Sequence, residues 1–335
     1  MPTPANLIPQ RKPAREPAAG RPNDSGECKA ESDLPHSTDP GLEIDPTRHG
    51  VQLKRCSPAL DRLVVRFARL GFTDIYHDRV RKQGLLGQLY VLLVGTPHLG
   101  SFANGFYLHR AMGRRQFSSI LDAGCGDGTF TFYVARRCPN ARVLGVDVGE
   151  QGLHGEENTL EICHRVQGIL QLPNLEFRKL DLRELDAADT FDFVYCFDVL
   201  EHIRENKQVL SNVYRALSKD GRFLLRIPTR AQKRILPKRF TAEHEKWAKV
   251  EHVGQHYEMD TLLADLKEIG YQVISAQYSV GFWGRLSFEL LEGLRTSRLP
   301  EVVQFGAMPL LKLLRWIDTQ AKLKEGDGLL VLCQK

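Results

Sequence analysis

The chain has 335 residues, of which 42% are hydrophobic and 26% charged, and a formal charge of +5 from 46 basic and 41 acidic side chains. This length fits one large domain or two modest ones, and the charge excess is too small for a nucleic-acid coat. Seven scattered cysteines without a CxxC pair exclude a disulfide scaffold and a zinc ribbon, and favour reduced thiols in the cytoplasm. The longest clean apolar run, Leu89 to Gly95, is far short of the ~20 residues of a membrane span.

The chain divides into three parts by composition. Residues 1–50 hold nine of the 17 prolines and no aromatic residue, so they cannot bury enough apolar surface to offset their ordering entropy, and we predict a disordered N-terminal segment. Residues 51–117 follow as a helical N-terminal extension, since Leu60, Leu63, Val64 and Phe67 have helical spacing. Residues 118–335 form the main domain.

Strand and helix patterns alternate through this domain. Such alternation predicts a parallel sheet with helices on both faces. We expect a helical insertion over 282–324, between the sixth and the seventh strand. The predicted strands begin at 119, 142, 175, 191 and 221 and cover 271–278 and 328–333, and the predicted helices are 128–137, 156–169, 204–218 and 259–269.

A glycine-rich turn, Leu121 to Thr129 (LDAGCGDGT), lies between the first predicted strand and the following helix. Glycine is needed where the chain turns sharply and where a ligand lies against bare backbone. Asp147 ends the next strand, 19 residues after Gly128, where a carboxylate can accept both hydroxyl hydrogens of a ribose. The unit therefore predicts a nucleotide-like ligand, and a ligand-free glycine turn is the alternative.

The spacing discriminates between two such ligands. A dinucleotide fingerprint requires G-x-G-x-x-G, whereas this turn reads G-x-G-x-G and has Thr129 at the position of the third glycine. Asp122 and Asp127 would also repel a pyrophosphate. A cationic ligand with one ribose fits better, and S-adenosylmethionine is such a ligand.

With these motifs the sequence resembles the class I S-adenosylmethionine-dependent methyltransferases, in particular the small-molecule group that includes quinone-biosynthesis enzymes. The resemblance covers about residues 85 to 280. It implies an α/β fold: a Rossmann-like, doubly wound seven-stranded sheet with an antiparallel last strand. The matching segments are the turn, 143–147, the fourth-strand motif 191–202 (FDFVYCFDVLEH) and 217–225 (LSKDGRFLL).

The resemblance also implies roles for cofactor-binding residues. The three glycines of the turn would approach the methionine moiety, Asp122 would order the turn, and Asp181 would accept from the adenine amine. Phe197 and Asp198 would face the ligand at the carboxyl edge of the sheet. The implied contacts together are Asp122, Gly124, Cys125, Gly126, Gly128, Asp147, Val148, Asp181, Leu182, Phe197 and Asp198.

Two histidines, His202 and His252, are the candidate catalytic residues, because a base is needed where the acceptor must lose a proton. Asp198, Glu201 and His202 are spaced i, i+3, i+4 and would share one helical face. Such a set could hold a divalent metal, as in some quinone O-methyltransferases that the sequence resembles. We favour a structural role for it and expect no metal.

We therefore expect a methyltransferase that acts on an oxygen, nitrogen or carbon of a small or lipid-linked acceptor. An RNA or protein methyltransferase, or a catalytically silent cofactor-binding module, are the alternatives. A basic run from Arg222 to Lys249 suits a phosphate-bearing substrate, a peripheral membrane contact or RNA, or is a solvated loop. Nucleic acid is disfavoured, because no Asn/Asp-Pro-Pro-aromatic set and no Pro-Cys nucleophile follows the fourth strand. The sequence leaves the oligomeric state open.

Overall fold

The structure is a computed structural model that describes residues 90, 94–95, 98–149, 158–229, 233–242, 252–254, 257–297 and 299–335. Its contacts divide the chain into two units, Met1–Lys54 and Arg55–Lys335, and every described residue belongs to the second. The predicted disordered segment 1–50 and most of the predicted extension 51–117 lie outside the described residues.

Seven strands form one sheet in the order β3-β2-β1-β4-β5-β7-β6. The five strands from β3 to β5 run parallel, and β7 pairs antiparallel with both β5 and β6. The predicted fold class, a Rossmann-like α/β sheet with an antiparallel last strand, is confirmed. The strands are β1 (Ser119–Ala123), β2 (Arg142–Asp147), β3 (Leu175–Lys179), β4 (Phe191–Phe197), β5 (Leu217–Pro228), β6 (Gln272–Ser279) and β7 (Gly328–Gln334).

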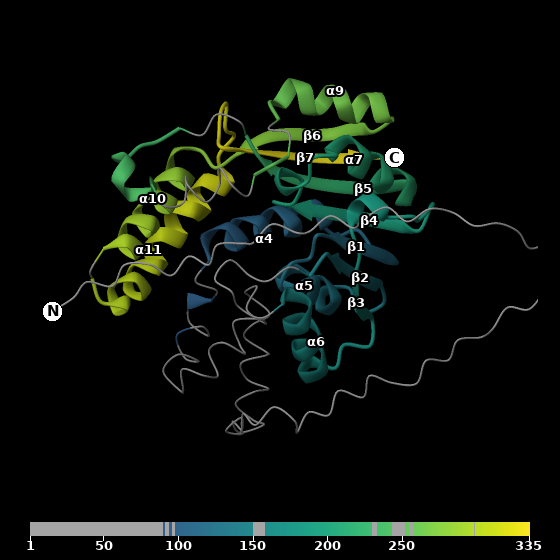
Figure 1. Cartoon of the computed structure of the whole chain (residues 1–335), viewed down its shortest axis with the longest axis horizontal. Helices are drawn as coiled ribbons and strands as arrows, with labels where there is room; N and C mark the ends of the chain where they lie inside the picture. The colour runs from purple at the N-terminus through teal and green to yellow at the C-terminus, as the bar shows by residue number, and fades with distance from the viewer. Residues whose placement is uncertain are drawn as a thin grey trace, which may run out of the picture. The chain divides into compact units, whose positions relative to one another are not determined.

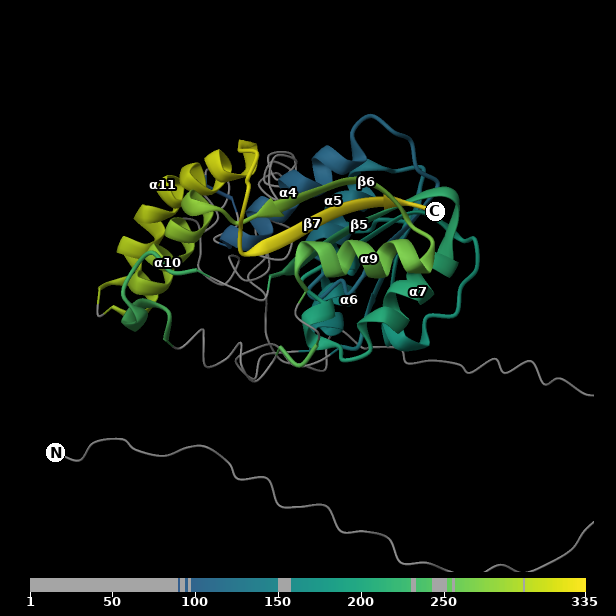
Figure 2. The ribbon, with the colours of Figure 1, turned by 90° about the horizontal axis from the view of Figure 1, so that it is seen from above.

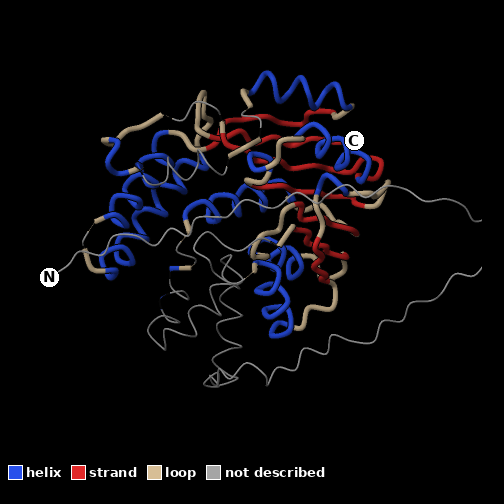
Figure 3. Tube along the Cα trace, viewed as in Figure 1, coloured by secondary structure: helices blue, strands red, loops and turns tan. Residues whose placement is uncertain are grey.

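Helices cover both faces of this sheet (Figure 3). One face packs against α4 (Leu99–Met112), α5 (Thr129–Arg137) and α6 (Thr159–Leu170), around a cluster that includes Phe132 and Phe193. The opposite face packs against α7 (Asn206–Ala216) and α9 (Met259–Ile269). Burial of apolar side chains on both faces explains the near-continuous apolar strands of the sequence.

The structure corrects one boundary between predicted elements. We expected a helix to 218 and a strand from Gly221, but α7 ends at Ala216 and β5 begins at Leu217. The reason is a register shift between Phe191 and Phe193 in the pairing of β4 with β5. Leu217 pairs with Phe191 ahead of the regular ladder, so the strand starts four residues earlier than its apolar pattern suggests.

The predicted helical insertion consists of two helices between β6 and β7: α10 (Phe282–Thr296) and α11 (Glu301–Gln320). They pack side by side at one end of the sheet, and α11 also contacts α4 (Figures 1 and 2). Within the described part of the chain, neither these helices nor the others combine the length and the apolar character that a bilayer crossing requires.

Candidate functional site

The glycine-rich turn joins β1 to α5 through three left-handed residues. Gly124, Gly126 and Gly128 have φ values of +85°, +52° and +75°, which residues other than glycine rarely adopt. The Gly124 and Cys125 amides both donate to the Val146 carbonyl of β2, each at 2.9 Å. The turn is therefore tied to the end of the neighbouring strand, at the carboxyl edge of the sheet.

One side of the turn is packed and the other is open. A Cβ added at Gly124 would lie 2.3 Å from Cγ2 of Val199, and one at Gly128 would lie 3.0 Å from the Cys163 sulfur. A Cβ added at Gly126 meets nothing within 4 Å. Gly126 thus presents bare backbone beside Asp147, as a ligand lying against the turn requires.

This contrast makes a testable prediction. Gly124→Ala should destabilise the protein strongly, because its methyl group would collide with Val199 in addition to the left-handed strain. Gly126→Ala should cost only the strain, about 1–2 kcal/mol, yet should lower S-adenosylmethionine affinity at least tenfold because the methyl group occupies the open side. Thermal unfolding and titration calorimetry of both variants check this, and an unchanged affinity of Gly126→Ala would contradict it.

Asp147, at the end of β2, holds the turn by its carboxylate. Its Oδ2 accepts from the Gly126 amide and its Oδ1 from the Gly149 amide, both at 2.9 Å. A carboxylate has about four lone-pair sites, so each oxygen keeps one for a further donor. The side chain can therefore order the turn and still accept ribose hydroxyls.

Asp122, on β1, is buried beneath the turn and 3% exposed. Its Oδ2 accepts from the Thr131 hydroxyl at 2.7 Å and the Tyr195 hydroxyl at 2.8 Å. Burial, aided by the nearby Asp147 and Asp127 carboxylates, raises the pKa of Asp122 to about 7 although both hydroxyls oppose the shift. These bonds link β1, α5 and β4, and this geometry suits the predicted ordering role.

The raised pKa of Asp122 has a consequence for stability. Because the folded protein binds this proton more tightly than the unfolded chain, the free energy of unfolding falls as pH rises from about 4 to about 7. Asp122→Asn keeps an acceptor for both hydroxyls and removes the titration. Its stability should exceed that of the wild type at pH 8, with a flatter profile in chemical denaturation.

The control for this prediction is Asp186→Asn, at a carboxylate that is 95% exposed. It should follow the wild-type profile. An Asp122→Asn profile as steep as that of the wild type between pH 4 and pH 7 would contradict the assigned protonation.

The other predicted cofactor contacts lie around the same edge of the sheet and differ in how exposed their side chains are. Val148 is 38% exposed and Phe197 packs edge-to-face on Phe130 at 5.2 Å, whereas Cys125 and Leu182 are buried. Asp181 follows β3 and caps a short 3-10 turn, η2 (Leu182–Glu184). Its carboxylate pairs with Arg183 at 2.6 Å, and this pairing lowers the pKa of Asp181. An adenine amine would share that carboxylate with a cation.

Asp198 binds partners other than Glu201 and His202. The three side chains would share a face only if a helix began at the end of β4, but a single 3-10 turn, η3 (Leu200–His202), follows β4, and α7 begins at Asn206. Asp198 instead has a left-handed backbone, pairs with Arg226 and accepts from Asn104 Nδ2 at 3.0 Å.

The structure brings His252 to this turn in place of Asp198. Ligand atoms of Glu201, His202 and His252 all lie within 4.8 Å of one another, and the two imidazole rings meet edge-to-face at 5.2 Å. The Gly254 amide donates to the Glu201 carbonyl at 2.8 Å and fixes the segment. A Cβ at Gly254 would lie 2.3 Å from the Leu200 carbonyl oxygen, so this approach depends on glycine.

Glu201 is 3% exposed, and its Oε2 has no hydrogen-bond partner in the described structure. Burial raises the pKa of this carboxyl to about 8. It therefore holds a proton near neutral pH, which a bound cation would have to displace.

Two residues of the site, Asn104 and Arg226, were not predicted from the sequence. Asn104 lies on α4 and is 4% exposed within the apolar run FANGFYLHRAM, where a buried amide is the one unusual residue. Arg226 interrupts the apolar strand β5. Both anchor Asp198, so the signal was a polar side chain at a position where the periodicity calls for an apolar one.

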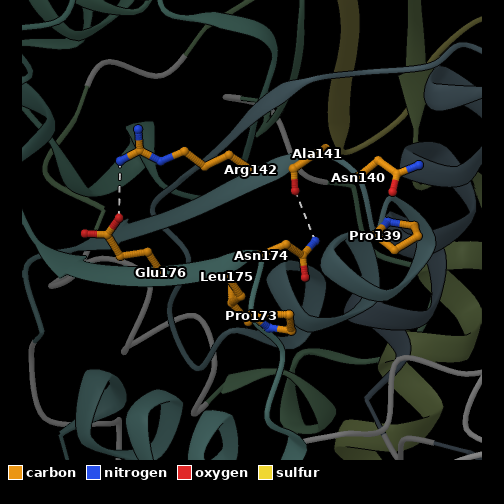
Figure 4. Close-up of a pocket in the computed structure, with 8 residues that line it drawn as sticks. All are labelled: Pro139, Asn140, Ala141, Arg142, Pro173, Asn174, Leu175 and Glu176. Atoms are coloured by element: carbon orange, nitrogen blue, oxygen red, sulfur yellow. Dashed lines mark hydrogen bonds and ion pairs between the residues drawn. The ribbon is translucent and has the colours of Figure 1, made fainter.

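A pocket lies at the other edge of the sheet, around the starts of β2 and β3 (Figure 4). Its polar groups bond to one another: Arg142 pairs with Glu176 at 3.3 Å, and Asn174 Nδ2 donates to the Ala141 carbonyl at 3.0 Å. Because β1, β2 and β3 are parallel, this pocket lies at their amino ends and the glycine-rich turn at the carboxyl end. The side chains of the pocket bind one another and hold this edge of the sheet together.

Part of the chain is similar to known methyltransferases. Residues 121–223 match a family model described as a methyltransferase domain. Trans-aconitate 2-methyltransferase of Deinococcus radiodurans is 30% identical over 114 residues, covering 34% of this chain and 39% of that protein. A ubiquinone biosynthesis O-methyltransferase of Hahella chejuensis is 32% identical over 94 residues, covering 28% and 35%. The chain thus spans little more than a third of the length of these relatives.

A solved structure extends the likeness of the fold. Phosphoethanolamine N-methyltransferase 2 of Haemonchus contortus, in complex with S-adenosyl-L-methionine, superposes with a TM-score of 0.50 and 18% identity, over 73% of this chain and 56% of that one. The fold is that of a Rossmann-like domain. Over residues 121–223 the chain is similar to a methyltransferase domain.

Proposed function

We propose that this chain transfers a methyl group from S-adenosylmethionine to a small or lipid-linked acceptor in the cytoplasm. The observation that carries the proposal is the open side of Gly126 next to a carboxylate, Asp147, with acceptor capacity to spare. The relatives named above methylate small molecules according to their names, and this supports a small acceptor over RNA or protein.

The cofactor, when bound, supplies a methyl group already activated by its sulfonium, so positioning accounts for much of the rate. The turn at Gly124–Gly128 would bind the methionine moiety, and Asp147 the ribose hydroxyls. His202, on η3 directly after β4, and its neighbour His252 would take a proton from the acceptor. Asp198, held by Arg226 and Asn104, would keep the end of β4 in place.

A second candidate mechanism is a divalent cation held by Glu201, His202 and His252. The close approach of three ligand atoms favours it, because such a cation can lower the pKa of a bound phenol or alcohol. Chelation separates the two mechanisms. A base mechanism predicts unchanged turnover in EDTA, whereas loss of turnover that Mg²⁺ or Zn²⁺ restores would assign the cation.

Titration calorimetry of the whole chain tests the proposal. S-adenosylmethionine should bind with measurable affinity and NAD should not. Binding of NAD in preference to S-adenosylmethionine would overturn the proposal. If the chain binds S-adenosylmethionine but transfers no methyl group to any acceptor in cell extract or to RNA, the alternative of a catalytically silent cofactor-binding module would apply.

A further inference from the structure

Helix α11 buries Met308 and Leu311 but also exposes a row of large apolar side chains and buries three charged ones. Ten of the fourteen exposed large apolar side chains in the described structure belong to α10, α11 and their connection. On α11 they recur at helical spacing along one side, and Val302 and Leu310 are 72% and 60% exposed. We name this side the α11 apolar face, which comprises Val302, Val303, Leu310, Leu313, Trp316 and Ile317.

The buried side of the same helix carries charge. Lys312, Arg315 and Asp318 are each less than a tenth exposed. The Lys312 ammonium donates to the Val94 carbonyl, and Asp318 Oδ2 accepts from the Gly281 amide at 3.0 Å. These bonds fix the rotation of α11 about its axis. Turning the α11 apolar face inward would break both bonds and deprive the Val94 carbonyl and the Gly281 amide of these partners.

Exposed aromatic side chains begin α10, and exposed basic side chains lie at the end of α10 and after α11. Phe282 and Trp283, at the start of α10, are 52% and 42% exposed. This end of α10 meets the end of α11, since a Cβ at Gly284 would lie 2.6 Å from both Arg315 Nη1 and Asp318 Oδ2. Basic side chains lie near the ends of both helices: Arg295, which pairs with Glu292 at 2.8 Å, ends α10, and the exposed Lys322 and Lys324 follow α11.

We propose that the α11 apolar face, with Phe282 and Trp283, inserts into the surface of an anionic lipid bilayer. An apolar helix face bordered by tryptophan and by basic residues is the pattern that lies in the headgroup region. The exposed cations Lys322 and Lys324 suit anionic lipid headgroups. Tyr90 contacts α11 outside this face: its hydroxyl donates to the Phe305 carbonyl at 2.9 Å, and its ring packs with the cluster that includes the buried Met308.

This inference goes beyond the proposed function, because it needs neither cofactor nor acceptor. Its failure would leave S-adenosylmethionine binding intact, and the two tests are therefore distinguishable. Its consequence is that the insertion between β6 and β7 would hold the domain at the membrane, where a lipid-linked acceptor resides.

The experiment uses the full chain and vesicles of phosphatidylcholine alone or with a quarter of phosphatidylglycerol. Two of the three tryptophans of the chain, Trp283 and Trp316, belong to the proposed surface. Wild-type protein should sediment with the anionic vesicles, its tryptophan emission should shift to the blue, and 0.5 M salt, on the order of full electrostatic screening, should weaken binding severalfold. Neutral vesicles should bind more weakly.

The variant is the double substitution Leu310→Glu with Leu313→Glu, which should weaken vesicle binding at least tenfold. The matched control is Val273→Glu with Ile274→Glu, two exposed apolar residues on β6 that are 40% and 45% exposed. The control should bind as the wild type does. Circular dichroism and cofactor titration should show both variants folded.

Three results would overturn the proposal. The first is no wild-type binding at about 1 mM anionic lipid, a concentration at which even one weak anchor registers. The second is equal loss of binding in variant and control. The third is a dimer in light scattering that the Leu310/Leu313 variant alone converts to monomer, without vesicle binding, which would assign the face to a second copy.

Discussion

Replacing His202 by glutamine is expected to lower methyl transfer by about 10²–10⁴-fold, with little change in cofactor affinity. His202 lies on the 3-10 turn that follows β4, exposed at the edge where the cofactor would bind. Glutamine preserves size and hydrogen bonding but cannot accept a proton near neutral pH. The pH profile of the residual activity should lose its acidic limb, because that limb reports the base in its free form.

The matched control for this prediction is His164→Gln. His164 is also exposed and also meets an aromatic ring edge-to-face, that of Phe177 at 6.2 Å, but it lies on α6. It should retain wild-type activity. If the His202 variant keeps full activity, His202 is not the base. The rate would then come from positioning the acceptor against the methyl group, and the histidine pair would have no catalytic role.

Asp147→Ala should weaken S-adenosylmethionine binding at least tenfold. Two ribose hydroxyls on a carboxylate form charge-assisted hydrogen bonds worth ~1.5–3 kcal/mol each. The substitution also releases the Gly126 and Gly149 amides, so the turn loses its anchor. Titration calorimetry measures the change directly.

Asp192→Ala provides the comparison for this variant. Asp192 likewise accepts from two backbone amides, those of Ser118 at 2.6 Å and Ser119 at 3.1 Å, but at the amino end of β1. It should lose comparable stability and keep cofactor affinity. If both variants bind S-adenosylmethionine equally well, Asp147 does not hold the ribose.

The elements that follow from local pattern were predicted well. The glycine-rich turn, the strand ending at Asp147 and helix α9 with its glycine at 270 are set by neighbouring residues, and the structure has them at the predicted places. The start of β5 was missed because a register shift at Phe191 has no signal in a single strand.

The partners of the site residues could not be predicted, because they are distant in the sequence. Asp198 pairs with Arg226 and Asn104, 28 and 94 residues away. Helical spacing grouped Asp198 with His202, whereas the backbone at Asp198 is left-handed and only a 3-10 turn follows β4. The approach of His252 to Glu201 depends on the tight fit of Gly254 against η3, which no periodicity reveals.

The most direct test of the central claim is mass spectrometry of a metabolite and lipid extract incubated with the whole protein and S-adenosylmethionine carrying a deuterated methyl group. We expect a product with the mass increment of one deuterated methyl group, formed by the wild type and strongly reduced with Asp147→Ala at a cofactor concentration below saturation. A bound cofactor that labels nothing in the extract, while RNA or protein in a parallel incubation acquires the label, would contradict the small or lipid-linked acceptor.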